Sequence, residues 1–527
     1  MARVARPAQL KAMLRDGQEL ALVDVREQGV YFHGHLLFAA CIPLSHLEMR
    51  VADLIPRKGT RIVVCDGGDE DLARRAADRL TSFGYLDVAV LEGGVRGWRE
   101  AGYEVFSGVN VVSKAFGEYV EHRYDTPRLS AEELNARIAR GENMIILDSR
   151  PMEEYTNLSI PGGIDCPGAE LVYRVFDAAP APDTLVVVNC AGRTRSIIGA
   201  QSLLNAGIPN RVMALKNGTM GWQLAGFEVA RGQTRHAADP SDAGSARARV
   251  AAGHVAVRFN VKTIDMARLA QWQAESDSRS LYVLDVRTAA EFAAGHLPGS
   301  RHAPGGQLVQ ATDEYVATRH ARVVLVDDNG VRAIMTASWL NQMGWNEVRV
   351  LYGGLTGELE TGPHVATRFD FAAAPTMTAK SLQKSLAQSD KWTVFDFATS
   401  LQFRRQHIPG ARWAVRSRLA EALAVLPDAH RVVVTSPGDI LAHYAARDLM
   451  RAQPTRDVKV LEGGTRAWMA AGYASASNAD GFTTKANDVW YKPYEQSEGV
   501  RKAMEEYLTW EVNLMPQIER DGDARFR

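Results

Sequence analysis

The chain has 527 residues, of which 46% are hydrophobic and 23% charged, with a formal net charge of −1 at neutral pH. This length predicts several domains rather than one core. A charge near zero argues against nucleic acid or an anionic membrane as a partner. We find no apolar run long enough to cross a bilayer and no secretory signal, and four cysteines are too few for a disulfide framework. We therefore expect a cytoplasmic, multidomain protein.

Two sequence markers recur four times in the same order. The first is a short apolar strand ending in aspartate, at Asp24, Asp148, Asp285 and Asp396. The second is an apolar strand with a glycine turn, at residues 91–94, 215–218, 351–354 and 461–464. The period of roughly 110–140 residues is the size of a compact domain. Alternating strands and helices in each copy predict an α/β fold, a mostly parallel sheet with helices on both faces.

These markers divide the chain into four units and a helical C-terminal extension. The predicted boundaries are residues 1–107, 127–231, 258–364 and 375–473 for units one to four and 474–527 for the extension. A capping box of Ser130 and Glu133 begins the first helix of unit two. An amphipathic segment at 114–124 connects units one and two, and residues 232–253 form a linker or a loosely held helix.

The extension carries several aromatic residues with helical periodicity around residues 500–518. We expect them to pack on the fourth unit rather than to form a binding platform. They are Trp490, Tyr491, Tyr494, Tyr507 and Trp510.

The centre of the chain is the cysteine that follows the β-branched run 186–188 in unit two. Cys190 begins a tight loop with Arg193 and Arg195, and a buried helix follows. At such a strand–loop–helix junction, converging N–H groups and the helix dipole favour negative charge. Two neighbouring arginines should also favour the thiolate. The sequence therefore predicts a reactive Cys190 that attacks an anionic substrate.

The equivalent loops of the other units lack this nucleophile. The register places Asp66, Asp327 and Ser436 opposite Cys190, and the loop of unit one is acidic over residues 66–71. An acidic loop repels an anion and raises the pKa of a thiol. Units one, three and four are therefore predicted to be catalytically inactive.

With these residues in place, each unit resembles a rhodanese (sulfurtransferase) domain. In unit two the markers are Asp148 and Arg150, the 160–162 turn, the 190–195 loop and Gly218 before Trp222. The resemblance covers nearly the whole chain and implies four tandem rhodanese-like domains. It implies that Cys190 forms a persulfide and that a loop holds the donor anion. The loop residues are Ala191, Gly192, Arg193, Thr194, Arg195 and Ser196.

Three details refine this resemblance. Unit two has Ser159 where units three and four have His296 and His407, so a histidine base at that position is absent. Related dual-specificity phosphatases have a loop one residue longer, and Ser196 stands where that loop would place its arginine, which favours sulfur over phosphorus. Two alternative roles remain open for Ser196: it donates a hydrogen bond to the sulfur of Cys190, or it caps the helix. Asp148 and Arg150 are expected to form a structural ion pair that braces the loop.

The predicted function is transfer of a sulfane sulfur in a ping-pong cycle through a Cys190 persulfide. The donor is thiosulfate or a similar small anion, with 3-mercaptopyruvate left open, and the acceptor is cyanide or a thiol, including a protein sulfur acceptor. No metal or cofactor is expected, because no C-x-x-C pair occurs. The alternative is a scaffold or sulfur-relay protein whose other units bind protein partners.

Overall fold

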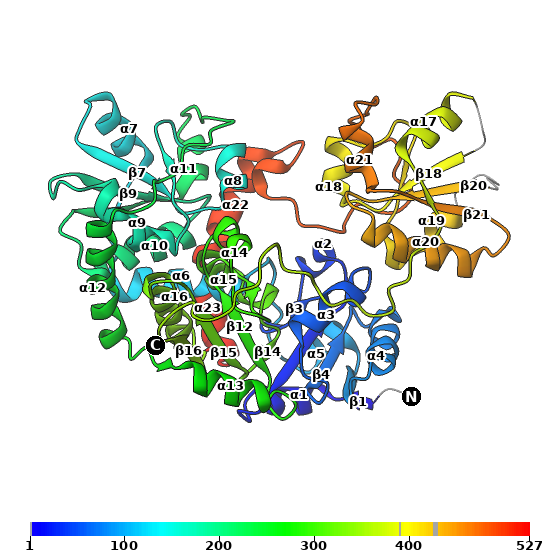
Figure 1. The fold of residues 1–527 in the computed structure, drawn as a ribbon, viewed down its shortest axis with the longest axis horizontal. Helices are drawn as coiled ribbons and strands as arrows, with labels where there is room; N and C mark the ends of the chain where they lie inside the picture. The colour runs from blue at the N-terminus through cyan, green and yellow to red at the C-terminus, as the bar shows by residue number, and fades with distance from the viewer. Residues whose placement is uncertain (1–2, 389–391, 425–430) are drawn as a thin grey trace.

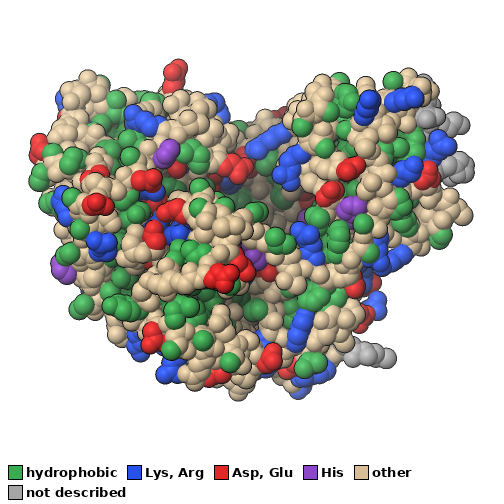
Figure 2. Space-filling model, viewed as in Figure 1, with side chains coloured by type: hydrophobic (Ala, Val, Ile, Leu, Met, Phe, Trp, Pro, Cys, Tyr) green, Lys and Arg blue, Asp and Glu red, His purple; other side chains and the backbone are tan. Residues whose placement is uncertain are grey.

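The computed structural model describes residues 3–388, 392–424 and 431–527. Four sheets, one in each unit, lie around the centre of the molecule (Figure 1). Units two and four occupy the upper corners, units one and three lie below, and the C-terminal extension crosses from unit four to unit two. The surface is hollowed between the two upper corners (Figure 2). The predicted four-unit α/β architecture is confirmed.

Unit one has a parallel sheet in the order β1-β5-β4-β2, with β3 also paired to β2. A strand from unit three, β14 (Thr318–Arg319), adds to this sheet antiparallel to β2, so the two units share a sheet edge. The elements are β1 (Arg3–Ala5), α1 (Pro7–Met13), β2 (Leu20–Asp24), α2 (Gln28–Tyr31), β3 (Ala40–Cys41), α3 (Leu47–Leu54), β4 (Arg61–Cys65), α4 (Leu72–Ser82), β5 (Asp87–Leu91) and α5 (Gly94–Glu100).

Unit two follows the connecting helix α6 (Val111–Tyr124) and has the sheet order β6-β10-β9-β7-β8. The central strand β9 is buried along its whole length, as expected of a β-branched run in a parallel sheet. The elements are β6 (Arg128–Leu129), α7 (Ala131–Ala139), β7 (Met144–Asp148), α8 (Met152–Asn157), β8 (Ile164–Asp165), α9 (Glu170–Ala178), β9 (Leu185–Asn189), α10 (Thr194–Ala206), β10 (Val212–Leu215) and α11 (Gly218–Leu224).

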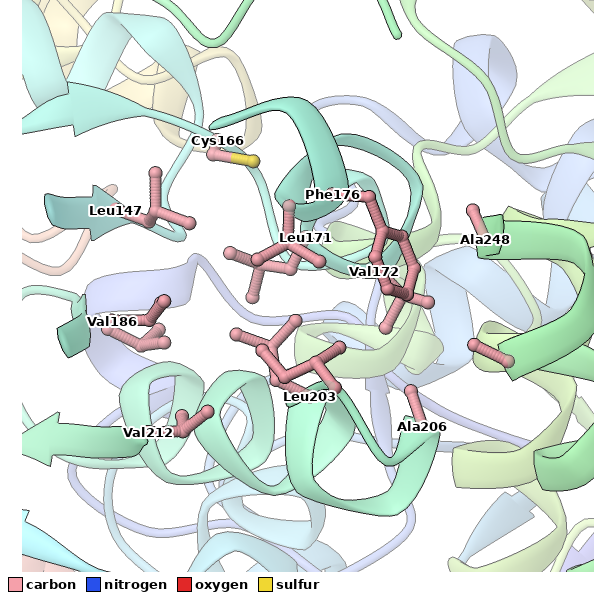
Figure 3. Packing of buried hydrophobic residues seen from close by; sticks show 14 of the residues in the cluster. Leu147, Cys166, Leu171, Val172, Phe176, Val186, Leu203, Ala206, Val212 and Ala248 are labelled. Carbon is pink, nitrogen blue, oxygen red and sulfur yellow. The ribbon is translucent and has the colours of Figure 1, made fainter. Parts of the chain in front are cut away.

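Unit two has a hydrophobic cluster on each face of this sheet, and the larger one packs against α9, α10 and α12 (Asp242–Arg258). Leu147 and Val186 on the strands meet Leu171 on α9 and Leu203 on α10 (Figure 3). Helix α12 adds Ala248 to the same cluster. Of the two alternatives for residues 232–253, the helix is confirmed over Asp242–Arg258, but it is firmly packed rather than loosely held, because Ala248, Ala252 and Val255 are buried.

Units three and four repeat the same order, with sheets β11-β16-β15-β12-β13 and β17-β21-β20-β18-β19. Unit three contains β11 (Thr263–Ile264), α13 (Met266–Ala274), β12 (Leu281–Asp285), α14 (Ala289–Ala294), β13 (Arg301–His302), α15 (Gly305–Gln310), η1 (Thr312–Glu314), β15 (Arg322–Val326), α16 (Val331–Gln342) and β16 (Val348–Leu351). Unit four contains β17 (Thr376–Met377), α17 (Ala379–Ala387), β18 (Trp392–Asp396), α18 (Ser400–Arg405), β19 (Arg412–Trp413), η2 (Arg416–Arg418), α19 (Leu419–Ala424), β20 (Arg431–Thr435), α20 (Ile440–Ala452), β21 (Asp457–Leu461) and α21 (Gly464–Ala470).

The extension contains η3 (Pro493–Glu495), α22 (Val500–Val512) and α23 (Leu514–Asp521). Tyr491 does contact unit four, where its hydroxyl donates to Ser400 Oγ at 2.8 Å. Helix α22 instead packs on unit two, with Met504 and Leu508 against Met220. The prediction that the aromatic residues pack on unit four is therefore wrong for this helix, because α22 packs against α11 and α6.

Candidate active site

The strand register identifies the equivalent positions in the four units. Each marker aspartate pairs with the last residue of the neighbouring strand, in the pairs Asp24–Cys65, Asp148–Asn189, Asp285–Val326 and Asp396–Thr435. The next residues along the chain are Asp66, Cys190, Asp327 and Ser436. The predicted equivalence of these four positions is confirmed, and all four lie at the carboxyl ends of strands, where such sheets bind ligands.

The Cys190 thiol lies between β9 and α10 and is only 2% exposed. Burial raises its pKa, although Arg195 and the hydrogen bond from the Ser196 N–H act to lower it. The expectation of an easily ionised thiol is therefore wrong. Loss of solvation on burial raises the pKa of Cys190 by more than Arg195 and the Ser196 N–H lower it. The hydroxyl of Ser196 donates to Arg193 O at 2.8 Å, and no side-chain cap is formed.

The amide that contacts Cys190 has a counterpart in the other units. In unit three, the Asp327 carboxylate accepts hydrogen bonds from the N–H groups of Gly330 (2.7 Å) and Ala333 (3.1 Å). In unit one, Asp66 accepts from Gly68 (2.9 Å) and Ala73 (3.0 Å). These two loops therefore hold a carboxylate of the chain itself where the Cys190 loop holds a thiol.

In unit four the position is held by a neutral hydroxyl. Ser436 Oγ accepts from the N–H of Ala442 at 3.2 Å and donates to Gly438 O at 2.5 Å. The helix amide thus has a protein partner in each unit, and the chemical difference between the units lies in that partner.

Arg195 lies beside Cys190 but is held by a carboxylate. Its guanidinium makes two hydrogen bonds to Glu154, of 3.1 and 2.9 Å, and Lys492 of the extension lies 3.4 Å from the same carboxylate. The three charged side chains are partly buried, with Lys492 the most exposed at 33%. Arg195 can still place positive charge near a donor at Cys190, and Glu154 fixes its position.

Arg193 points elsewhere. Its guanidinium donates to both oxygens of Glu118 on α6 at 2.7 Å, and it also bonds Glu121 and Asn217. The expectation that this side chain holds the donor is corrected, because two carboxylates of α6 already occupy it. Arg193 instead fixes the loop to the connecting helix.

The remaining loop residues face the extension or the turn of unit two. Ala191 O accepts from the N–H of Met220 at 2.9 Å. Thr194 donates its hydroxyl to Glu511 on α22 at 3.3 Å. A methyl group added to Gly192 would lie 3.1 Å from Glu511 Oε2 and 3.4 Å from a ring carbon of Tyr507. The extension therefore covers the loop directly.

Asp148 and Arg150 form a buried ion pair beneath the loop. Arg150 donates two hydrogen bonds to Asp148, of 2.8 and 2.7 Å, and one to Leu158 O. The side chain of Asn189 donates to the same aspartate at 2.8 Å. Because Asn189 directly precedes Cys190, this pair sets the direction in which the loop leaves the sheet.

The histidines of units three and four pack on neighbouring rings. His296 stacks on Phe292 and His407 on Phe403, with ring centroids 3.7 Å apart. The Nδ1 atom of each is hydrogen-bonded to the carbonyl of that phenylalanine. The equivalent Ser159 pairs through its backbone with Ala230. The interpretation of this position as a base is therefore corrected: it is a packing position.

The other cysteines are less suited to chemistry. Cys166 and Cys65 are buried, Cys41 is partly exposed, and burial raises the pKa of all three thiols. Within residues 3–388, 392–424 and 431–527, no group of three or more His, Cys, Asp or Glu could hold a metal ion. In the same ranges, no helix combines the length and hydrophobicity that a membrane span requires.

Sequence reasoning did not predict that four charged or polar residues lie around this loop, namely Lys114, Glu154, Tyr507 and Glu511. A signal was present for two of them. Glu511 falls on the same helical face as Met504 and Leu508, and Lys114 follows Val111 by three residues on one face of α6. A charged residue within an apolar stripe of an amphipathic helix indicates a buried charge, which needs a partner.

The fold and this strand-end cysteine loop define a tandem rhodanese protein. The family model of the rhodanese-like domain matches residues 6–101, 130–225, 265–359 and 378–471, so the chain belongs to the rhodanese family. A crystal structure of a thiosulfate sulfurtransferase from Pseudomonas aeruginosa is 48% identical, covers 100% of this chain and 99% of that chain, and has a TM-score of 0.93.

Two shorter solved structures match about one unit each. The Alr3790 protein from Anabaena sp. is 31% identical over 21% of this chain and 86% of its own, with a TM-score of 0.19. The BH2092 protein from Bacillus halodurans is 22% identical over 21% of this chain and 80% of its own, also with a TM-score of 0.19.

Proposed function

We propose that the protein is a sulfurtransferase that carries a sulfane sulfur on Cys190. The observation that supports this most strongly is the comparison of the four strand-end positions, where a thiol occurs at Cys190 and oxygen side chains occur at Asp66, Asp327 and Ser436. The full-length similarity to a thiosulfate sulfurtransferase supports the same class of reaction and makes thiosulfate the first donor to test.

In this proposal the Cys190 thiolate attacks the outer sulfur of thiosulfate. The sulfur–sulfur bond of the donor breaks, sulfite leaves with the bonding electron pair, and Cys190 becomes a persulfide. An acceptor then removes the outer sulfur and restores the thiolate, which completes a ping-pong cycle. The amide of Ser196 and the guanidinium of Arg195 are the groups placed to stabilise negative charge at the sulfur.

The experiment is thiosulfate-to-cyanide transfer by Cys190→Ser, with Cys166→Ser as the matched control. Cys166 lies in the same unit and is also buried, with its N–H bonded to Asp148 O. We expect the first variant to lose transfer entirely and the second to keep it within about threefold, since a hydroxyl at Cys190 cannot form a persulfide. Transfer by Cys190→Ser at the wild-type rate would exclude this function.

A further inference from the structure

Three groups beside the Cys190 loop come from segments outside the four matched domains: Lys114 on α6, and Tyr507 and Glu511 on α22. Lys114 is 3% exposed and Glu511 is 2% exposed. Buried charges are costly unless they are paired and hydrogen-bonded. Their place against the loop therefore points to a role at the reacting sulfur.

The carboxylate of Glu511 has one bonded and one free oxygen. Oε1 accepts a hydrogen bond from the Tyr507 hydroxyl at 3.0 Å and from the Thr194 hydroxyl at 3.3 Å. Oε2 is buried and has no hydrogen-bond partner among the described residues. It lies over Gly192, two residues from Cys190, where an added methyl group would come within 3.1 Å of it. The free oxygen therefore faces the loop that carries the nucleophile.

The groups around Glu511 set its affinity for a proton. Burial and the carboxylate of Glu118 raise its pKa, and Lys114, the Tyr507 hydroxyl and Arg193 act in the opposite direction. The ammonium of Lys114 lies 4.9 to 5.1 Å from the ring centroids of Trp490, Tyr507 and Trp510, which hold it in place. A carboxylate whose pKa is raised by burial is better matched to general base catalysis near neutral pH.

We propose that Glu511 is the base that takes the proton from an incoming thiol in the second half-reaction, and that the acceptor is accordingly a small thiol. This inference rests on the proposed Cys190 persulfide. A thiol needs a base, because the thiolate is the nucleophile and a free thiol has a pKa of about 8.5. Helix α22 covers the loop and leaves Cys190 only 2% exposed, which favours a small acceptor over a protein.

The step balances without an oxidant or reductant. After sulfite leaves, the outer sulfur of the Cys190 persulfide takes a proton from solvent. The acceptor thiol then gives its own proton to Glu511 Oε2, and the resulting thiolate attacks that protonated outer sulfur. The sulfur–sulfur bond of that persulfide breaks, and its electron pair remains on Cys190 as a thiolate. The product is the persulfide of the acceptor, and Glu511 later returns its proton to solvent.

The test separates an acceptor that carries a proton from one that does not. The full-length protein is first incubated with thiosulfate to form the persulfide, and the excess donor is removed. The loaded protein is then mixed at about pH 8 with one of two acceptors, dithiothreitol or sulfite. At this pH sulfite is largely unprotonated. Roughly a quarter of a thiol with a pKa of about 8.5 is already ionised at pH 8, so we expect Glu511→Gln to slow the dithiothreitol step about fourfold and to leave the sulfite step unchanged. The dithiothreitol deficit should shrink as the pH rises above the pKa of the thiol.

The matched control is Glu506→Gln, which removes a carboxylate from the exposed face of the same helix and should leave both steps unchanged. Glu511→Asp keeps a carboxylate and should retain more of the dithiothreitol rate than Glu511→Gln. An unchanged dithiothreitol step, or equal slowing with both acceptors, would overturn the proposal. If the wild-type protein never gains sulfur, it is the Cys190 function that fails, so the two failures are distinguishable.

Discussion

The loops of units two and three differ in one decisive side chain on the same framework. In unit two Arg195 bonds Glu154, and in unit three Arg332 bonds Glu291 with N–O distances of 2.8 and 3.0 Å. Both arginines lie five residues after the strand-end position. The arginine–glutamate pair is therefore part of the shared architecture, and the thiol is what distinguishes unit two.

We propose that unit three keeps the rhodanese fold without a site for the donor. The Asp327 carboxylate accepts the two amide hydrogen bonds that an anion would otherwise take. Charge-assisted hydrogen bonds of this kind are among the stronger ones in proteins. A built-in carboxylate thus satisfies the helix N-terminus and excludes an anionic donor by charge and by volume.

The largest effect is expected from Cys190→Asp, which gives unit two the side chain of unit three. Sulfur transfer should be lost completely, because no nucleophilic sulfur remains in the loop. The fold should persist, because a carboxylate can accept the Ser196 N–H as Asp327 accepts that of Ala333. Transfer assays and thermal unfolding check both points, and a variant that unfolds would show that the two loops are not interchangeable.

The next largest effect is expected from Arg195→Gln, measured against Arg332→Gln. Both changes break a partly buried ion pair, so both should lower the stability of the protein. Arg195→Gln should also slow persulfide formation about 100-fold, because it removes the cation that lowers the pKa of Cys190. Stopped-flow release of sulfite is the measurement. Equal rates in the two variants would mean that Arg195 has only the structural role seen in unit three.

A smaller effect is expected from pH. Burial raises the pKa of Cys190, and only the thiolate attacks the donor. Below that pKa the thiolate fraction increases about tenfold for each pH unit, so persulfide formation should accelerate across pH 7 to 8 in the same proportion. If the rate of persulfide formation does not change between pH 6 and 8, the pKa of Cys190 lies below about 6. The loop would then be more exposed than in this structure.

The repeated markers were sufficient to predict the four sheets and the place of Cys190. A short strand that ends in aspartate and a glycine turn are local signals, and parallel pairing then brings Asp148 beside Asn189. The equivalent positions Asp66, Asp327 and Ser436 follow from the same register. These predictions held because each depends on residues within one unit.

The surroundings of the thiol could not be predicted in the same way. Thr194 and Glu511 are hydrogen-bonded although 317 positions separate them in the chain. The position of Arg193 in the loop predicts that it binds the sulfur donor. Its partners in the structure are instead Glu118 and Glu121, which lie on a helix outside unit two. The pKa of Cys190 depends on burial by such distant segments. A prediction from the loop sequence alone therefore gives the wrong direction for the shift of this pKa.

The most direct test of the account is the mass of the cysteine peptides after incubation with thiosulfate and removal of excess donor. The account predicts one added sulfur atom on the Cys190 peptide and none on the peptides of Cys41, Cys65 and Cys166. An unmodified Cys190 in protein that turns over thiosulfate, or added sulfur on another cysteine instead, would contradict it.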